Sequence, residues 1–393
     1  MFKNLLSVFN SKVESKPKGA GAISNCALYI TSQKIPDVAA IQSLNNGANV
    51  EVIPGHGSEP WSRITISLPT GSSVTINEKG PDAPDLAQHL DGFQGFVWHL
   101  AGQEMDGNVW ELMLRISRVK HVLGITITPS NDAASKNLVR ALALSSHALV
   151  FQDGAIFDPN NRLLLGQGRK SDPTASVPIY ETAVKRKVRS DEALSKLGIH
   201  VNAQLPPIEG DEESSLRSGH DMARRAIVLW SALAKLEGDK GAAQLVEDAG
   251  LSKSVTASEA KFLKTSKPSG EEVRKFSWRS EALWTILWSL GVVSDLDLTG
   301  KPCDQHKLAQ TMKTLIAHDK GKNFVATAKP RPENEILDKK DVVYRLHWSM
   351  TNDKLEKQNP HAANPDVIQE RHYALNWITK YRNQDWDDVS TDT

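Results

Sequence analysis

The period of the apolar residues changes part-way along the chain, and no other feature of the sequence restricts the fold as strongly. Up to about residue 166, short runs of β-branched and aromatic residues alternate with amphipathic stretches of helical period. From about Leu216 onward, the apolar residues recur at helical spacing. This order predicts the α+β class, with an N-terminal mixed α/β sheet domain followed by an all-α helical-bundle domain.

The N-terminal half alternates predicted strands with predicted helices. Runs rich in Val, Ile and Thr and bounded by Gly, Pro or Asn are typical of strands. They occupy residues 26–31, 63–68, 73–78 and 122–129, and residues 95–102 have strand-like residues at their centre. The turn signal Asp153-Gly154 predicts a hairpin or strand pair over 148–166. Helices are predicted over 82–90, 108–119 and, after the capping residues 130–132, up to about residue 146.

The C-terminal half contains predicted helices with clear end signals. Thr256 and Glu259 have the spacing of a capping box, and Gly291 ends a strongly apolar stretch over 278–290. That stretch is predicted to be the central buried helix of the domain. Further helices are predicted over 221–237, 241–248, 339–350 and 365–381, the last with Pro365 at its first helical position.

Length and composition favour two folded domains. The chain has 393 residues, and single cores stop growing beyond roughly 250–300 residues. Hydrophobic residues make up 39% and charged residues 24%, which is typical of globular proteins. Because residues 167–188 begin with a polar, Pro-containing stretch, they are predicted to be a linker. The predicted division is a flexible N-terminus over 1–20, an α/β domain over 21–166, this linker and a helical domain over 189–393.

Charge and cysteine content exclude several classes of function. Lys+Arg and Asp+Glu are equal at 47 each, so the chain has no overall charge that would attract nucleic acid. Cys26 and Cys303 are isolated in sequence, which indicates reduced thiols in a cytoplasmic protein and no structural zinc site. Runs of about 18 apolar residues are absent, so a membrane-spanning helix is not expected. We expect no metal, no cofactor and no nucleic-acid or membrane partner.

Six segments of the second half together resemble a known bacterial family. They are RSDEALSKLGI (189–199), LRSGHDMARRAIVL (216–229), WRSEALWTILWSLG (278–291), EILDKKDVVYRLHW (335–348), ERHYALNW (370–377) and DWDDVSTDT (385–393). In this order they resemble the domain of unknown function numbered 4272, over residues 185–393. The resemblance implies a helical, cytosolic bacterial domain and brings no catalytic residues with it. Because some members look like companions of secreted toxins, it also implies an immunity protein that binds a toxin.

Charged residues near the tryptophans are candidates for binding. In the helix predicted over 278–290, Glu281 would suit the positive end of the helix dipole, but Arg279 would not. We therefore expect a specific carboxylate partner for Arg279, from the acidic C-terminal segment. Trp386 is expected to anchor that segment, with its aspartates meeting arginines or staying solvated. The candidate binding residues are Arg279, Glu281, Arg345, Arg371 and Trp386.

Two histidines provide an alternative, catalytic interpretation. His347 and His372 both lie on apolar faces of predicted helices, where a histidine is ordinarily a satisfied core residue. Facing each other across a bundle, with Glu370 and Asp388, they would form an acid–base site of a hydrolase. The sequence lacks GxSxG, P-loop, kinase and Cys–His nucleophile motifs. The first hypothesis is therefore a non-enzymatic protein-binding protein, and a hydrolase is the alternative.

Overall fold

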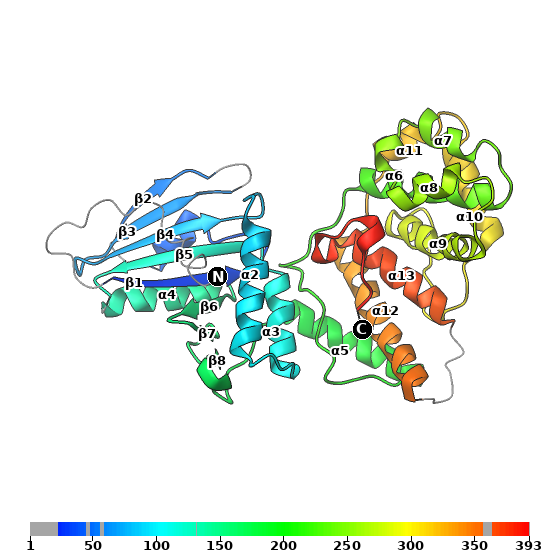
Figure 1. Ribbon diagram of the computed structural model, residues 1–393. Coiled ribbons are helices and arrows are strands. Elements are labelled where there is room, and N and C mark those ends of the chain that lie inside the picture. The colour runs from blue at the N-terminus through cyan, green and yellow to red at the C-terminus, as the bar shows by residue number, and fades with distance from the viewer. Residues whose placement is uncertain (1–22, 45–47, 56–58, 131, 357–363, 393) are drawn as a thin grey trace. The chain divides into compact units, whose positions relative to one another are not determined.

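The computed structural model describes residues 23–44, 48–55, 59–130, 132–356 and 364–392 (Figure 1). The predicted flexible N-terminus lies outside these residues. The chain divides into two compact units. The first is Met1–Glu181 with Glu212–Ser214, and the second is Thr182–Asp211 with Ser215–Thr393. The α+β class is confirmed, because the first unit contains a helix-covered sheet and the second consists mainly of helices.

The first unit is built on one eight-stranded sheet. Its strands are β1 (Ser24–Ile30), β2 (Asn49–Ile53), β3 (Arg63–Ser67), β4 (Ser73–Lys79), β5 (His121–Thr128), β6 (Leu149–Gln152), β7 (Ala155–Phe157) and β8 (Leu163–Leu165). Their order across the sheet is β2-β3-β4-β5-β1-β6-β7-β8. Every described pairing is antiparallel, so the expected mixed sheet is an antiparallel one.

Helices cover both faces of this sheet (Figure 1). They are α1 (Val38–Ser43), α2 (Leu86–Leu100), α3 (Gly107–Ser117) and α4 (Ala133–Ser145). Neighbouring residues of a strand point to opposite faces. Leu28 of β1 therefore packs in one core with α1 and α4, while Tyr29 packs in another with α2 and α3. This alternation places two separate hydrophobic cores on the sheet.

The strand-like character predicted for residues 95–102 is wrong, because most of them belong to α2. Phe93 and Val97 are separated by four residues and are both fully buried, which is the spacing of one helix face. Their burial against the sheet outweighs the strand preference of the aromatic and β-branched residues in this segment.

The second unit consists of helices around one large core. They are α5 (Glu181–Lys196), α6 (Gly219–Leu236), α7 (Ala242–Asp248), α8 (Ala257–Lys264), α9 (Gly270–Ser289), α10 (Gln305–Ile316), α11 (Lys322–Thr327), α12 (Glu333–Glu356) and α13 (Pro365–Ile378). Side chains from α6, α9, α12 and α13 fill the centre, among them Ile227, Leu287, Leu346 and Leu375. The last eight residues of the predicted linker, 181–188, form the first half of α5. None of the helices in the described part of the chain is long and apolar enough to cross a membrane.

The apolar stretch over 278–290 is the second half of a longer helix. Helix α9 begins at Gly270, after a capping box formed by Ser269 and Glu272. The expectation that Arg279 and Glu281 lie in a first helical turn is therefore wrong. Both side chains lie in the buried middle of α9, where they meet α13 rather than the end of the helix dipole.

Candidate functional site

The two candidate catalytic histidines do meet. His347 of α12 and His372 of α13 have their Nδ1 atoms 3.0 Å apart. Burial lowers the pKa of His347 to about 4 and that of His372 well below its usual value, so both rings are neutral at pH 7. Asn376 donates from Nδ2 to the Ser390 carbonyl and to Nε2 of His372. Both ring nitrogens of His372 are therefore engaged, Nδ1 with His347 and Nε2 with Asn376.

The other two candidate catalytic residues lie apart from this pair. The Glu370 carboxylate is engaged with Arg279, at 3.0 Å between Oε2 and Nη1. Asp388 is exposed in the short 3-10 helix η6 (Trp386–Asp388). The structure thus places the four side chains in a histidine pair, an ion pair and an exposed carboxylate.

Arg279 does have a specific carboxylate partner, although not one from the C-terminal segment. Its guanidinium pairs with Glu370 and lies over the Tyr373 ring, with its carbon 4.1 Å from the ring centroid. It also lies 5.4 Å from the centroid of a ring of Trp386. A tail aspartate as its partner was the wrong prediction, because α13 brings Glu370 directly beside the middle of α9.

Arg371 and Glu281 form a buried ion pair between α13 and α9. Nη2 and Nε of Arg371 donate to the same Glu281 oxygen at 2.9 and 3.2 Å. Arg371 also donates to the Lys301 carbonyl, and the second Glu281 oxygen accepts from the Cys303 amide at 2.7 Å. This satisfied interior network holds the chain between α9 and α10.

Arg345 is likewise an interior residue. It forms two hydrogen bonds with Asp341, one turn earlier in α12, at 2.9 and 3.0 Å. Arg345 is 2% exposed and Asp341 is fully buried. The tail aspartates were predicted either to meet arginines such as Arg345 and Arg371 or to stay solvated. Both arginines are neutralised inside the helical core, whereas Asp385 and Asp388 are exposed.

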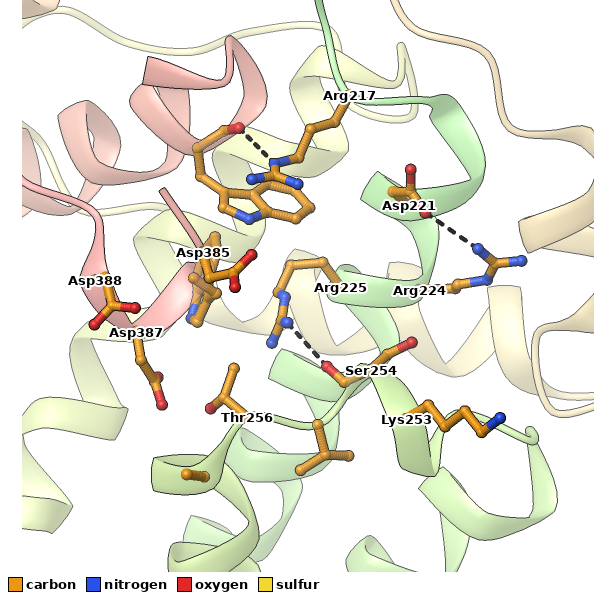
Figure 2. Close-up of a pocket in the computed structure, with 14 residues that line it drawn as sticks. Arg217, Asp221, Arg224, Arg225, Lys253, Ser254, Thr256, Asp385, Asp387 and Asp388 are labelled. Carbon is orange, nitrogen blue, oxygen red and sulfur yellow. Dashed lines mark hydrogen bonds and ion pairs between the residues drawn. The ribbon is translucent and has the colours of Figure 1, made fainter. Parts of the chain in front are cut away.

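An open groove in the second unit is lined by charged side chains and two tryptophans. Its volume is about 430 Å³. It is formed by the start of α6, the chain through η4 (Ser252–Ser254) into α8, the end of α13 and η6. Figure 2 shows Arg217 and Arg225 reaching in from the α6 side, Arg224 beside Asp221, and Asp385, Asp387 and Asp388 on the C-terminal segment opposite. Three segments that are distant in sequence therefore converge on this groove.

Two arginines and two tryptophans form the inner wall of the groove. The Arg217 guanidinium lies 4.6 Å from the Trp377 ring centroid and donates to the carbonyls of Trp377 and Gln384, at 2.9 and 2.8 Å. The Arg225 guanidinium lies 5.0 Å from Trp386 and 5.8 Å from Trp377. Stacking on these aromatic faces fixes the direction of both cations.

The two arginines differ in how their charge is balanced. Arg225 pairs with buried Glu259 at 2.7 Å. Arg217 is only partly buried and bonds to carbonyl oxygens, so no carboxylate in the described chain neutralises it within 4.0 Å. Burial lowers the pKa of Arg217, and Asp385 and Asp221 act in the opposite direction. Arg217 remains charged at pH 7 because arginine titrates far above it.

The rim of the groove carries both signs of charge. Asp387 caps α8 by accepting from the amide and hydroxyl of Ser258, at 3.1 and 2.7 Å. Burial raises the pKa of Asp387, but these hydrogen bonds outweigh it and bring the pKa below its usual value. Exposed Lys253, Asp385 and Asp388 form no ion pair within 4.0 Å among the described residues. The rim therefore presents a free cation and two free carboxylates.

The sequence interpretation found Trp386 but missed Arg217, Arg225 and Trp377. The sequence contained a signal for Arg225. It follows Met222 by three residues and precedes Leu229 by four, so it lies on the apolar face of the predicted helix. A charge on the apolar stripe of a helix indicates a buried ion pair. Arg217 gave no comparable signal, since its partners are backbone carbonyls of a distant segment.

A second cluster, in the first unit, has the composition of a metal site. One ligand atom from each of Glu59, Glu78 and His121 lies within 4.8 Å of the other two. Its members come from a loop and two strands that are far apart in sequence, so the sequence has no ligand spacing that indicates the cluster.

Comparison with known proteins identifies the second unit. Residues 186–389 match the family model described as "Domain of unknown function (DUF4272)". No curated protein and no solved structure matches the chain. The matched region contains Arg217, Trp377 and Trp386 of the groove and excludes the sheet of the first unit. Since the match covers more than half of its residues, the chain belongs to the DUF4272 family.

Proposed function

We propose that this protein is a non-enzymatic binding protein that acts in the bacterial cytoplasm and neutralises a secreted toxin. The groove between α6, α8, α13 and η6 is its proposed binding surface. The observation that carries the proposal is Arg217, a partly exposed cation that is stacked on Trp377 and that no carboxylate of the described chain pairs with within 4.0 Å. Arginine and tryptophan are the residue types that most often dominate the binding energy of protein interfaces.

The charges of the groove favour a protein partner over a small apolar ligand. Sites for small molecules are mostly apolar with a few polar groups, whereas eight of the 14 lining residues here are charged. Lys253 and Asp388 at the rim offer opposite charges to one partner surface, and such complementarity sets the specificity and the rate of association. The toxin as partner class comes from the family resemblance.

The hydrolase alternative has less support from the geometry. An acid–base site needs its groups within hydrogen-bonding reach of one substrate. His372 is 2% exposed, and its two ring nitrogens are hydrogen-bonded to His347 and Asn376. Glu370 forms an ion pair with Arg279, so neither side chain is available to a substrate.

The proposal is tested with secreted toxins encoded beside genes of this family. We expect the full chain to bind one of these toxins in isothermal titration calorimetry and to protect cells that express it. Lys253→Glu should weaken binding about tenfold or more, since reversing an interfacial charge turns attraction into repulsion. Lys313→Glu is the matched control, because it makes the same change at an exposed site on α10 away from the groove lining.

Two results would count against the proposal. A wild-type chain that neither binds nor protects would remove the function. Equal binding by the Lys253→Glu and Lys313→Glu variants would remove the groove as the binding surface. Circular dichroism of both variants verifies that exposed substitutions leave the fold intact.

A further inference from the structure

Glu59, Glu78 and His121 bring three ligand atoms together at one end of the sheet of the first unit. Nδ1 of His121 lies 3.0 Å from Oε1 of Glu78 and 3.7 Å from Oε2 of Glu59. Two ligand atoms at about 2.0–2.2 Å from a tetrahedral Zn²⁺ ion stand about 3.4 Å apart. The two observed distances bracket that value.

The strands fix two of the three groups. Glu78 lies near the end of β4 and His121 is the first residue of β5, and β4 pairs with β5 so that Glu78 is opposite Leu123. His121 is two residues before Leu123, so its side chain lies on the same face as that of Glu78. His121 is fully buried, which prevents its ring from turning outward into solvent.

Charge in this cluster is not balanced by the protein. The side chains of Glu78 and Glu59 are only 6% and 12% exposed. The charged groups that act on Glu59 are His121, Glu78 and Asp82, and no lysine or arginine in the described chain pairs with either glutamate within 4.0 Å. The two carboxylates bring negative charge into a nearly buried site, where unbalanced charge is costly. A divalent cation between them would balance it.

Gly80 allows the two carboxylates to approach each other. A Cβ atom at this position would lie 2.6 Å from Oε1 of Glu78 and 3.1 Å from Oε1 of Glu59. The backbone at Gly80 therefore closes directly over the pair, and any larger residue would push the carboxylates away.

We propose that Glu59, Glu78 and His121 form a binding site for a divalent transition-metal ion of the zinc type. One imidazole and two carboxylates match the nitrogen and oxygen ligands of Zn²⁺, whereas Mg²⁺ and Ca²⁺ prefer oxygen ligands alone. Three protein ligands leave one tetrahedral position for water or a substrate group. Neither thiol competes for the ion, since burial raises the pKa of Cys26 to about 12 and also raises that of Cys303.

The site is tested by titrating the chelator-treated full chain with Zn²⁺ in isothermal titration calorimetry. We expect about one equivalent to bind tightly, with Mg²⁺ failing to compete at the same concentration. Co²⁺ in place of Zn²⁺ should give the intense visible absorption of a tetrahedral site. The isosteric changes Glu59→Gln and Glu78→Gln should each weaken Zn²⁺ binding by about tenfold or more.

Asp82→Asn is the matched control, because Asp82 adds negative charge near Glu59 without belonging to the ligand set. It should leave the stoichiometry unchanged and the affinity within about threefold. Gly80→Ala should weaken binding although all three ligands remain. Circular dichroism in chelator shows whether each variant is folded. The proposal is overturned if the wild-type chain binds no Zn²⁺, or if Glu59→Gln and Glu78→Gln bind it as the wild type does.

Discussion

Three buried cations of the second unit each form an ion pair with a carboxylate of the same unit. Arg371 meets Glu281, Arg345 meets Asp341, and Lys340 meets Glu209. Removing one partner of a buried pair costs about 3–5 kcal/mol, whereas exposed pairs contribute about 0–1 kcal/mol. A substitution at such a cation would destabilise the domain and so weaken binding indirectly. Exposed rim residues such as Lys253 therefore separate recognition from stability better than the buried arginines do.

The histidine pair makes the stability of the second unit depend on pH. An unfolded histidine has a pKa of about 6.5, while His347 in the fold titrates at about 4. The unfolded chain therefore binds more protons between these values, so stability is complete above about pH 6.5 and falls as the pH drops toward 4. At pH 5 the loss from His347 amounts to about 2 kcal/mol.

His347→Gln should reduce this acid-dependent loss, because glutamine can still hydrogen-bond to His372 but does not titrate. Urea denaturation at pH 7 and pH 5 measures the free energy of unfolding for both proteins. His306→Gln is the control, since His306 is exposed on α10. The same pH dependence in wild type and the His347→Gln variant would contradict the prediction.

The burial of a single side chain could be predicted from sequence where it depended on the periodicity of one helix alone. The apolar lines through His347 and His372 indicated that both histidines face a core, and the pair indeed meets. Partners were not predictable, because a side chain such as Arg279 reaches whichever helix packs beside it. For the same reason Glu59, Glu78 and His121 gave no pattern in sequence, since the pairing of β4 with β5 joins two of them and a loop supplies Glu59.

At the level of elements, end signals were more informative than residue preferences. The capping boxes at Thr256 and Ser269 both begin helices, but only the first had been used. The omission misplaced Arg279 and Glu281 in the helix. In α2 the error had another cause, because Gly92 and Gly95 interrupt a helical pattern whose apolar face is supplied by Phe93 and Val97.

Two glycines in helices should respond to alanine in opposite directions. A Cβ atom at Gly219, in the first turn of α6, would lie 2.2 Å from the backbone oxygen of Ala328. Backbone cannot yield cheaply, so Gly219→Ala should destabilise the second unit by about 1–3 kcal/mol. Gly92 is exposed in α2 and its Cβ would meet nothing within 4 Å. Gly92→Ala should therefore stabilise the first unit by about 0.5–1 kcal/mol.

Thermal unfolding followed by circular dichroism compares both variants with the wild type. The pair serves as its own control, because the same atom is added inside a helix in each case. A Gly219→Ala protein as stable as the wild type would show that the start of α6 can move away from Ala328. A destabilised Gly92→Ala protein would show that the helix at this point needs the freedom of glycine.

At the level of the whole molecule, the change of apolar period correctly indicated a sheet followed by helices. Periodicity reports which faces of an element are buried, and this is why the fold class was accessible. The return of the chain to the first unit at Glu212–Ser214 was not accessible. It depends on long-range interactions, in which buried Glu213 pairs with buried Arg115 and Gln33 donates to the carbonyls of Glu212 and Glu213.

Breaking the ion pair between Arg115 and Glu213 should therefore destabilise the first unit and leave the stability of the second unit unchanged. Glu213→Gln leaves the Arg115 guanidinium, which is 4% exposed, without its carboxylate, at a cost of about 3–5 kcal/mol. Hydrogen exchange should then accelerate in β1 and β5 of the first unit and stay unchanged in α9 and α13 of the second. Glu212→Gln is the neighbouring control, because Glu212 is exposed and should leave both units unaffected. Equal acceleration in all four elements would mean that the units unfold together, and then the division into two compact units would have no thermodynamic counterpart.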